Sequence, residues 1–549
     1  MAVQIGQNFT GSTYFNGLNN GNSAAIPPDP NGAVGPKHFV EFINGSFTVY
    51  NKTNGQSVQR ISDVKFWQDA GLSSISTGSG LADPRIIYDP VSHRWFASQV
   101  DFDANAAAAG RDYTLEANDF LLAVSTNSDP RSFPGSNGNS PGSWRGFIFQ
   151  ADPDSGDFAD FPTLGLDSIA VYVSGDMFHG LTNAVGAALV SIPKADLLAG
   201  TPTIANLSWF GVMNYTNCGQ VLQPVTCFDG TSSGNILAVG DVGSDGNAHS
   251  NLVIFAVQNA AGPGATLTPS TVITVSPYIV PFNFDNIDPP QGWFTVPQPD
   301  DTTTLAGNDA RFSARVYAVG GVIYAVHSTE LNGRMAIRWY RISATNDSVL
   351  EAGVIADPDL DLFFPSIAAN SSGTVVIGCN GSSTDTNVSC YAIAGQTVNG
   401  VTTFGNRILL QPGGTSYHGD DELYEELYDL PQLSRWGDYS TLSVDPADPT
   451  RFWSIQMFPP PSDFSDVWST QITELLTSQL LPQLRIAPAG TNVMVSWSSL
   501  ATGYQLQSAT NLAPSIAWSN VTQTTSTNGG TISVLVPVSG NQKYFRLQK

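Results

Sequence analysis

Charged side chains are scarce in this 549-residue chain, and basic ones are the scarcest. Only 12% of the residues are Asp, Glu, Lys or Arg, and 22 basic against 46 acidic residues give a formal net charge of −24. Only 6 of the basic residues are Lys, and 16 are Arg. Because no basic cluster is available to neutralise phosphates, nucleic acids and anionic membranes are excluded as partners.

Long apolar runs and helical periodicity are also missing. No stretch of about 18 apolar residues occurs, so no membrane span is predicted. The best helical stretches, residues 194–199 and 421–428, are short. Hydrophobic residues make up 41% of the chain and aromatic residues 10%, which excludes a disordered protein. Brief β-branched or aromatic runs between 52 Gly, 35 Pro and many Asn and Asp indicate an all-β fold.

Cysteine is rare, and its four residues form two close pairs. Cys218 and Cys227 bracket a loop, while Cys379 and Cys390 flank a polar turn between two expected strands. Even, close spacing is typical of an oxidising compartment, so two disulfides are predicted in preference to buried free thiols. The start, MAVQIGQNF, has no secretory signal. The low Lys content and the many small polar residues nevertheless indicate a secreted or cell-surface protein in its mature form.

A repeated unit predicts how the strands are grouped. Each copy has an acidic or aromatic residue, often a Pro, an apolar run, a turn and a second apolar run. Clear copies span residues 82–100, 160–175, 309–328, 363–379 and 437–458, and weaker ones begin near Pro27 and Asn235. Intervals of roughly 50–80 residues match four-stranded blades with their loops. We predict a seven-bladed β-propeller over residues 1–478, with six or eight blades as the alternatives.

The C-terminal part follows another pattern. Residues 482–549 alternate between apolar and polar side chains and contain no copy of the repeated unit. A tryptophan-bearing strand, VMVSW, and a final KYFRL strand are typical of a small immunoglobulin-like or fibronectin-like β-sandwich. The sequence therefore predicts a second domain over these residues.

Polar residues stand just before the inner strand of each expected blade. In a propeller these positions converge on one mouth of the central tunnel, together with the ends of the second strands. From the inner strands they are Asp29, Asp83, Arg85, Asp160, Asp309, Arg311, Arg315, Arg435, Trp436, Asp438 and Tyr439. From the second strands they are Asp101, Asp103, Asp176, His179, His327 and Glu330. The alternative to a ligand site is that these groups cap turns and brace adjacent blades.

This arrangement of carboxylates and guanidinium groups predicts a glycan-binding pocket, since carboxylates serve as general acids and bases and arginines hold carboxylate or sulfate groups. The candidate catalytic residues are Asp83, Asp160, Asp309, Asp438, Glu330 and Tyr439. The candidate substrate-binding residues are Arg85, Arg311, Arg315, Arg435, Trp436 and His327.

The leading hypothesis is a secreted enzyme that acts on an extracellular polysaccharide, as a glycoside hydrolase or a polysaccharide lyase. A lyase would need a base such as His327 or Tyr439 beside an arginine. One alternative is a non-catalytic carbohydrate- or protein-binding adhesion protein. Another is a structural subunit of an extracellular assembly, which would self-associate through exposed strand edges.

Two acidic segments offer oxygen ligands for Ca²⁺. Residues 151–160 contain Asp152, Asp154 and Asp157, and residues 419–429 contain six further acids. Neither matches a Ca²⁺-binding helix–loop–helix motif, and a solvated acidic loop is the alternative. Six scattered histidines without His-x-x-x-His spacing argue against a transition-metal site.

Three stretches carry a resemblance to known proteins: DPNGAVGPKHFVEFINGSFTVYNKTNG, DPRIIYDPVSHRWFASQ and SRWGDYSTLSVDPADPTRFWSIQMF. Over most of residues 25–475 the chain resembles a large group of uncharacterised secreted bacterial propeller proteins. Its C-terminal segment resembles a sandwich module appended to many exported bacterial proteins. The resemblance implies export and a propeller, and supplies no catalytic residues.

Two turns, DPVSHRW and DPADPTRFW, are more distantly similar to sialidase-like propellers. They stand where those families place Ser-x-Asp-x-Gly-x-x-Trp, although the Gly is absent. A sialidase-like site would contain three convergent arginines and a Tyr–Glu nucleophile pair. The resemblance assigns these roles to Arg85, Arg311, Arg435, Tyr439 and Glu330.

Overall fold

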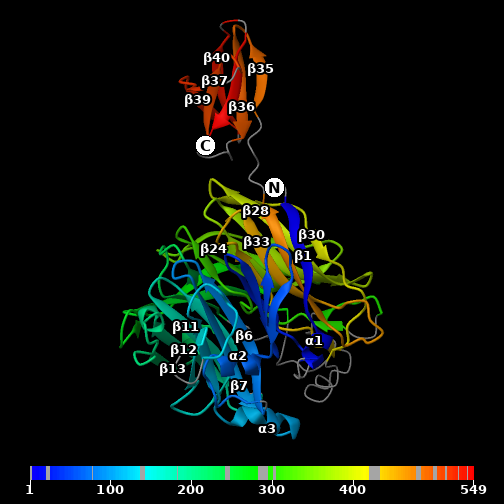
Figure 1. Cartoon of the computed structure of the whole chain (residues 1–549). Coiled ribbons are helices and arrows are strands. Elements are labelled where there is room, and N and C mark those ends of the chain that lie inside the picture. The colour runs from blue at the N-terminus through cyan, green and yellow to red at the C-terminus, as the bar shows by residue number, and fades with distance from the viewer. Residues whose placement is uncertain are drawn as a thin grey trace. The chain divides into compact units, whose positions relative to one another are not determined.

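The structure, a computed structural model, is all-β, as the sequence predicts (Figure 1). It describes residues 3–19, 25–76, 78–135, 142–181, 183–240, 248–281, 295–300, 304–419, 433–477, 484–498, 504–512, 516–528, 531–538, 540 and 542–548. Its internal contacts define a large unit, Ile5–Leu476, and a small unit of Met1–Gln4 with Thr477–Lys549. No helix in the described ranges is long and apolar enough to cross a membrane.

Four-stranded antiparallel sheets follow one another along the large unit. The first contains β2 (Asn31–Val34), β3 (His38–Ile43), β4 (Ser46–Asn51) and β5 (Ser57–Ile61). The second contains β6 (Ser79–Asp89), β7 (Arg94–Asp103), β8 (Asp119–Ser125) and β9 (Trp144–Gln150). The third contains β10 (Phe158–Leu166), β11 (Ala170–Phe178), β12 (Ala184–Pro193) and β13 (Ser208–Met213).

The next sheets carry additional pairings. One contains β14 (Gln220–Pro224), β16 (Asn235–Val239), β17 (Ala248–Gln258) and β19 (Thr271–Ile279), with β18 (Thr266–Leu267) on β17. It is joined, partly through β15 (Thr226–Cys227), to β22 (Tyr317–Val319), β23 (Val322–Leu331), β24 (Arg334–Ser343) and β25 (Val349–Ile355). Another contains β26 (Asp361–Ala369), β27 (Thr374–Ser383), β28 (Thr386–Val398), β29 (Val401–Phe404) and β30 (Ile408–Gln411).

The last large sheet joins the two ends of the unit. It contains β32 (Thr441–Val444), β33 (Arg451–Phe458), β34 (Ser469–Thr477) and the N-terminal strand β1 (Val3–Thr13). Figure 1 shows this blue strand among strands from much later in the chain. Successive four-stranded sheets closed by pairing the first strand with the last form a propeller-like arrangement.

Short elements connect these sheets. The helices are α1 (Tyr14–Asn19), α2 (Asp63–Asp69), α3 (Ala104–Ala108), η1 (Tyr113–Leu115), α4 (Lys194–Leu197) and α5 (Tyr215–Cys218). A small sheet contains β20 (Thr295–Val296), β21 (Thr304–Ala306) and β31 (Leu433–Ser434). The helical stretch expected at 194–199 forms α4, whereas the one at 421–428 lies outside the described residues.

Most copies of the repeated unit coincide with the first two strands of a sheet, such as β6 with β7 and β10 with β11. The faint copy near Asn235 is different, because β16 and β17 are the second and third strands of their sheet. The inner strand, β14, is the short segment QVLQP, which ends in a proline. Because β14 is only five residues long, the sequence pattern does not reveal it as an inner strand.

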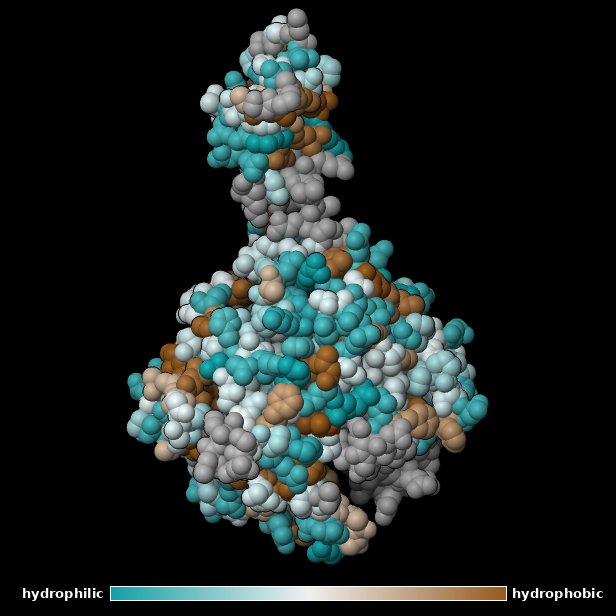
Figure 2. Space-filling view, viewed as in Figure 1, coloured by the Kyte–Doolittle hydropathy of each residue, from teal (hydrophilic) through white to brown (hydrophobic). Residues whose placement is uncertain are grey.

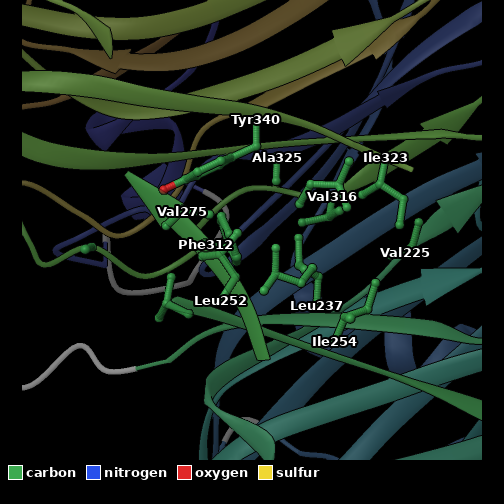
Figure 3. Packing of buried hydrophobic residues seen from close by; sticks show 14 of the residues in the cluster. Val225, Leu237, Leu252, Ile254, Val275, Phe312, Val316, Ile323, Ala325 and Tyr340 are labelled. Atoms are coloured by element: carbon green, nitrogen blue, oxygen red, sulfur yellow. The ribbon is translucent and has the colours of Figure 1, made fainter. Parts of the chain in front are cut away.

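The hydrophobic core lies between neighbouring sheets. In Figure 3, Leu237 and Leu252 of β16 and β17 point into the same space as Ile323 and Tyr340 of β23 and β24, with Phe312 between them. All five side chains are fully buried. Burying an aliphatic or aromatic side chain of this size stabilises a fold by about 1.5–3 kcal/mol, so these layers hold adjacent sheets together.

The surface of the large unit is mainly hydrophilic on the face shown in Figure 2, where hydrophobic residues are scattered. Large exposed hydrophobic residues such as Val91, Val272 and Phe464 come from separate loops and strands. Singly scattered residues of this kind are usual on soluble surfaces.

The small unit has two antiparallel sheets around one core. One contains β35 (Arg485–Ala489), β36 (Asn492–Ser498), β39 (Thr525–Asn528) and β40 (Thr531–Pro537), and the other β37 (Gln505–Ala509), β38 (Ser519–Asn520) and β41 (Tyr544–Gln548). Val495, Trp497 and Leu506 are buried between them. The predicted tryptophan strand is thus β36, and its indole lies in the core.

The four cysteines are free thiols, so both predicted disulfides are wrong. Across β27 and β28, Cys379 lies opposite Tyr391, whereas Cys390 lies opposite Asn380. Opposite residues face the same side of a sheet and consecutive residues face opposite sides. The two thiols therefore point to different faces and cannot be bridged.

The other cysteine pair is separated by packing. Cys218 lies in a hydrophobic cluster with Leu222 and Ala238, while Cys227 lies in a different cluster with Val225. Each thiol is buried in its own layer between sheets. The inference of an oxidising compartment from cysteine pairing therefore loses its basis.

Candidate functional site

Several inner strands are interrupted by a residue in the left-handed backbone region. Asp83 in β6 has a φ of 60°, Phe161 in β10 has 48°, Val221 in β14 has 54° and Phe364 in β26 has 46°. The pairing register shifts at each of these places. Such a conformation costs a non-glycine residue on the order of 1–3 kcal/mol and persists where the surroundings impose it. The bulges re-aim the neighbouring side chains.

Asp83 is the centre of a buried hydrogen-bond network. Its Oδ2 accepts a 2.6 Å hydrogen bond from the hydroxyl of Tyr439, and its backbone N–H donates to Oδ1 of Asn44 at 2.9 Å. The amide of Asn44 also donates to Oδ2 of Asp29 at 2.7 Å. The N–H of Asp438 donates to the other oxygen of Asp29 at 3.1 Å. Three segments of the chain are thereby locked together.

This crowding raises the proton affinity of the carboxyl groups. Burial, followed by the charges of Asp160 and Asp438, raises the pKa of Asp83 to about 6. Burial also raises the pKa of Asp29 well above its usual range, and Asp438 and Asp83 add to the shift. Like charges in one desolvated place favour protonation. The network therefore holds a proton at a pH where ordinary carboxyl groups are ionised.

Asp160 is the exposed member of this group. It lies on β10, directly opposite the buried Asp176 of β11. Enclosure by the protein raises the pKa of Asp160, and Asp438 raises it further. Burial raises the pKa of Asp176 to about 7 against the opposing charge of Arg311. Asp160 therefore meets solvent beside charged groups that act on it, and we call this cluster of Asp83, Asp160, Asp176, Asp438, Arg311 and Arg435 the mouth recess.

Two arginines of the mouth recess are held by aspartates. Arg311 forms a two-pronged ion pair with Asp309, with N–O distances of 2.8 and 2.6 Å, and its guanidinium lies 4.6 Å from the ring centre of Phe161. Arg435 is paired with Asp438. These arginines are braced, which fixes the positions of the carboxylates around them.

Two other arginines donate to backbone carbonyl groups. Arg85 donates from Nε to the carbonyl of Pro162 at 2.7 Å, and its guanidinium lies 3.5 Å from the ring centre of Tyr439. Arg315 donates to the carbonyl of Ile86 at 2.7 Å. Both line a closed space of about 10 Å³.

Two tyrosines of the mouth recess escaped the sequence reasoning. Tyr113 begins η1, in the loop between β7 and β8, and Tyr215 begins α5, between β13 and β14; both are half-buried. Burial raises the pKa of Tyr113, with the charge of Asp160 next. Burial raises the pKa of Tyr215, with Asp176 next. The sequence signal that could have identified these two tyrosines is an aromatic residue in a loop that leads to the predicted tunnel mouth.

Three predicted site residues lie elsewhere. His327 is 1% exposed in the core, where its Nε2 is 2.9 Å from the hydroxyl of Tyr340, and burial lowers its pKa to about 3. The indole of Trp436 is 2% exposed and packs edge-on against Tyr417. Glu330 accepts the N–H of Gly333 in the turn between β23 and β24. Neither His327 nor Trp436 is accessible to a substrate.

The remaining second-strand residues shape loops. Asp101 accepts the N–H of Asp119 at 2.7 Å, and burial raises its pKa to about 6. Asp103 caps the start of α3. His179 lies 3.1 Å from Asp157. These contacts order the loops beside the mouth recess.

The expected calcium ligands do not assemble. Asp152 is fully buried, and its carboxylate accepts the N–H groups of Asp154, Ser155 and Asp157. In the described ranges no group of three or more His, Cys, Asp or Glu is arranged to hold a metal ion. The second acidic segment falls almost entirely in residues 420–432, outside the described residues.

No known family matches the chain, and no curated protein matches it either. Among solved structures it is similar to an α-L-arabinofuranosidase from Fusarium graminearum, with 9% identity, a TM-score of 0.36, and coverage of 82% of this chain and 93% of that one. It is also similar to a polysaccharide lyase active on ulvan, with 10% identity, a TM-score of 0.35, and coverage of 80% of this chain and 90% of that one. The extracellular part of Drosophila semaphorin 1b has 7% identity and a TM-score of 0.32, with coverage of 87% of this chain and 88% of that one. At these scores the similarity assigns neither a reaction nor a site.

Proposed function

We propose that the large unit is a seven-bladed β-propeller. Within the described residues, the strand pairing supplies seven groups that can be blades: β2–β5, β6–β9, β10–β13, β14 with β16, β17 and β19, β22–β25, β26–β29, and β32–β34 with β1. Residues 482–549 are proposed as an immunoglobulin-like sandwich, on the support of two sheets around the Trp497 core. Secretion remains a prediction from the sequence.

We further propose that the protein is a glycoside hydrolase acting on an extracellular polysaccharide, with its site in the mouth recess. The observation that carries this proposal is Asp160, a solvent-accessible carboxyl group with a raised pKa. Such a group keeps its proton to a higher pH than an ordinary aspartic acid does and can donate it to a glycosidic oxygen. Asp438 is a second carboxylate close enough to raise that pKa, as a nucleophile or base requires.

The two tyrosines support a sugar as the ligand. Tyr113 and Tyr215 approach Asp160 and Asp176 closely enough to feel their charges. An aromatic ring offers an apolar face for a pyranose and a hydroxyl that can bond its substituents. Tyrosines and carboxylates together suit a neutral or weakly charged glycan.

Hydrolysis is preferred to elimination because the proposed lyase bases are enclosed. His327 is 1% exposed and Tyr439 is 3% exposed. The hydroxyl of Tyr439 is committed to Asp83, and burial raises its pKa well above the ordinary value. A group that neither meets the substrate nor ionises readily is a poor base for removing a sugar proton.

A non-catalytic glycan-binding protein is the second candidate. It is favoured by the ion pairs Arg311–Asp309 and Arg435–Asp438, which commit charges of the mouth recess to each other. In that case the carboxylates brace the blades and the tyrosines alone form the ligand surface.

The test is a panel of polysaccharides assayed for new reducing ends, for unsaturated products and for binding. The variants are Asp160→Asn and the control Asp347→Asn, which lies in the β24–β25 turn, where a φ of 59° suits asparagine. We expect reducing ends from the wild type and from Asp347→Asn, and almost none from Asp160→Asn. Binding without any product would replace the hydrolase by the second candidate, and unsaturated products would replace it by a lyase.

A further inference from the structure

The closed space below the mouth recess is unusual in its charge. It is lined by side chains that come from successive inner strands: Asn31, Arg85, Leu164, Gln223, Ser313 and Arg315. Two of the six are cationic and none is acidic. Among the described residues, neither Arg85 nor Arg315 forms an ion pair, in contrast to Arg311 and Arg435. Two guanidinium groups thus share one space with no acidic side chain in its lining, while the charge of Asp83 acts on Arg85 from outside that lining.

One donor in this space is unused. Arg85 is 6% exposed, and its Nη2 has no hydrogen-bond partner among the described residues. A buried donor without a partner costs about 1–3 kcal/mol, and more when it is charged. Other groups of Arg85 are engaged, since Nε bonds to the carbonyl of Pro162 and the guanidinium stacks on Tyr439. An acceptor inside the space would satisfy this atom.

The other lining groups are biased toward donation. The side-chain oxygen of Asn31 accepts the N–H of Ile86 at 3.0 Å, which leaves its NH₂ group to donate. Ser313 can donate through its hydroxyl. One N–H of Gln223 donates to the carbonyl of Phe312, and its side-chain oxygen can accept. The lining therefore offers more donors, on two guanidinium groups, two amide NH₂ groups and a hydroxyl, than acceptors.

We infer that this space is a binding site for one small monovalent anion of the size of chloride, held between Arg85 and Arg315. The room left between these side chains admits about one water-sized sphere, so it takes a single small species rather than sulfate, phosphate or a carboxylic acid. An anion satisfies the Nη2 donor and adds negative charge beside both guanidinium groups. Burial, together with the charge of Arg85, already lowers the pKa of Arg315 to about 10, which is the strain that an anion relieves.

The decisive experiment uses wild-type crystals grown with sodium bromide as the probe. Bromide scatters anomalously, whereas water does not. We expect one anomalous peak within hydrogen-bond range of Arg85 Nη2. A water molecule in that place, with no anomalous signal, would overturn the inference. This outcome is independent of whether the protein cleaves any glycan.

A solution measurement gives a second readout. The melting temperature is followed as sodium chloride replaces sodium gluconate at constant ionic strength, for the wild type, Arg315→Gln and Arg338→Gln. The control residue, Arg338, is also buried and also donates to a carbonyl, that of Ser276, in another part of the fold. An anion at roughly 100 times its Kd raises Tm by about 2–3 °C in a unit of this size. We expect this rise in the wild type and in Arg338→Gln, and its loss in Arg315→Gln; an equal rise in all three would mean a non-specific salt effect and would contradict the inference.

Discussion

The mouth recess and the closed space beneath it contain the same kinds of strand but opposite charge arrangements. On β6, Asp83 belongs to the recess and Arg85 to the closed space, and only Pro84 and a bulge separate them. In the recess, carboxylates outnumber arginines and one of them, Asp160, meets solvent. In the closed space, two arginines and no acidic side chain form part of the lining. A carboxyl group that can exchange a proton with a ligand is therefore found in the mouth recess. Arg85 and Arg315, in contrast, hold the inner strands in place through bonds to backbone carbonyl groups.

The largest expected effect is the loss of stability when a core residue, rather than a residue of the mouth recess, is truncated. Trp436→Ala should lower the free energy of unfolding by about 3–5 kcal/mol, because it empties a fully packed position. Tyr113→Ala, at a half-buried position of the recess, should cost far less. Urea denaturation of both variants measures this. Equal losses would mean that the recess is as much a structural core as the cluster around Trp436.

The pH dependence of stability tests the raised pKa values. The folded state holds the proton of Asp83 up to about pH 6, whereas an unfolded aspartate loses it near its ordinary pKa of about 4. The protonated group therefore stabilises the fold below pH 4, and this contribution is lost as the pH rises through 6. The free energy of unfolding should fall on the order of 2–3 kcal/mol over this window. In Asp83→Asn the fall should be smaller, and parallel curves for variant and wild type would contradict the account.

Much of the mouth recess could be predicted because the repeated unit shows which residues stand at the start of each inner strand. Asp83, Asp160 and Asp438 all stand near the start of an inner strand, and the structure brings them together. His327 was misassigned because a polar residue in an otherwise apolar strand can face a neighbouring tyrosine in the core as well as a tunnel. Tyr113 was missed because its loop has no repeated pattern. The spacing of residues along the sequence predicts where a strand begins, whereas the course of a loop depends on tertiary contacts that the spacing does not show.

The role of the tyrosines separates ligand binding from proton transfer. Tyr113→Ala should raise KM about tenfold with little change in kcat, since an aromatic contact contributes about 1.5 kcal/mol. Tyr113→Phe keeps the ring and should remain near the wild type. Steady-state kinetics on the polysaccharide that is cleaved measures both constants. A fall in kcat alone would place Tyr113 in the chemical step instead.

The smallest effect is expected from reduction. The buried thiols of Cys218, Cys227, Cys379 and Cys390 form no bonds to break, so dithiothreitol should leave the melting temperature unchanged. Titration of the unfolded, non-reduced protein should find four free thiols. A disulfide would instead contribute about 2–4 kcal/mol and disappear on reduction.

The most direct test of the central claim is the pH profile of kcat/KM for the wild type and Asp160→Asn on the glycan that the panel identifies. The account predicts that wild-type activity falls as the pH rises through the raised pKa of Asp160, above the range in which an ordinary aspartic acid loses its proton. It predicts a loss of about 10²–10⁴-fold in Asp160→Asn at the optimum. Full activity in Asp160→Asn, with the wild-type profile, would contradict the assignment of proton transfer to the mouth recess.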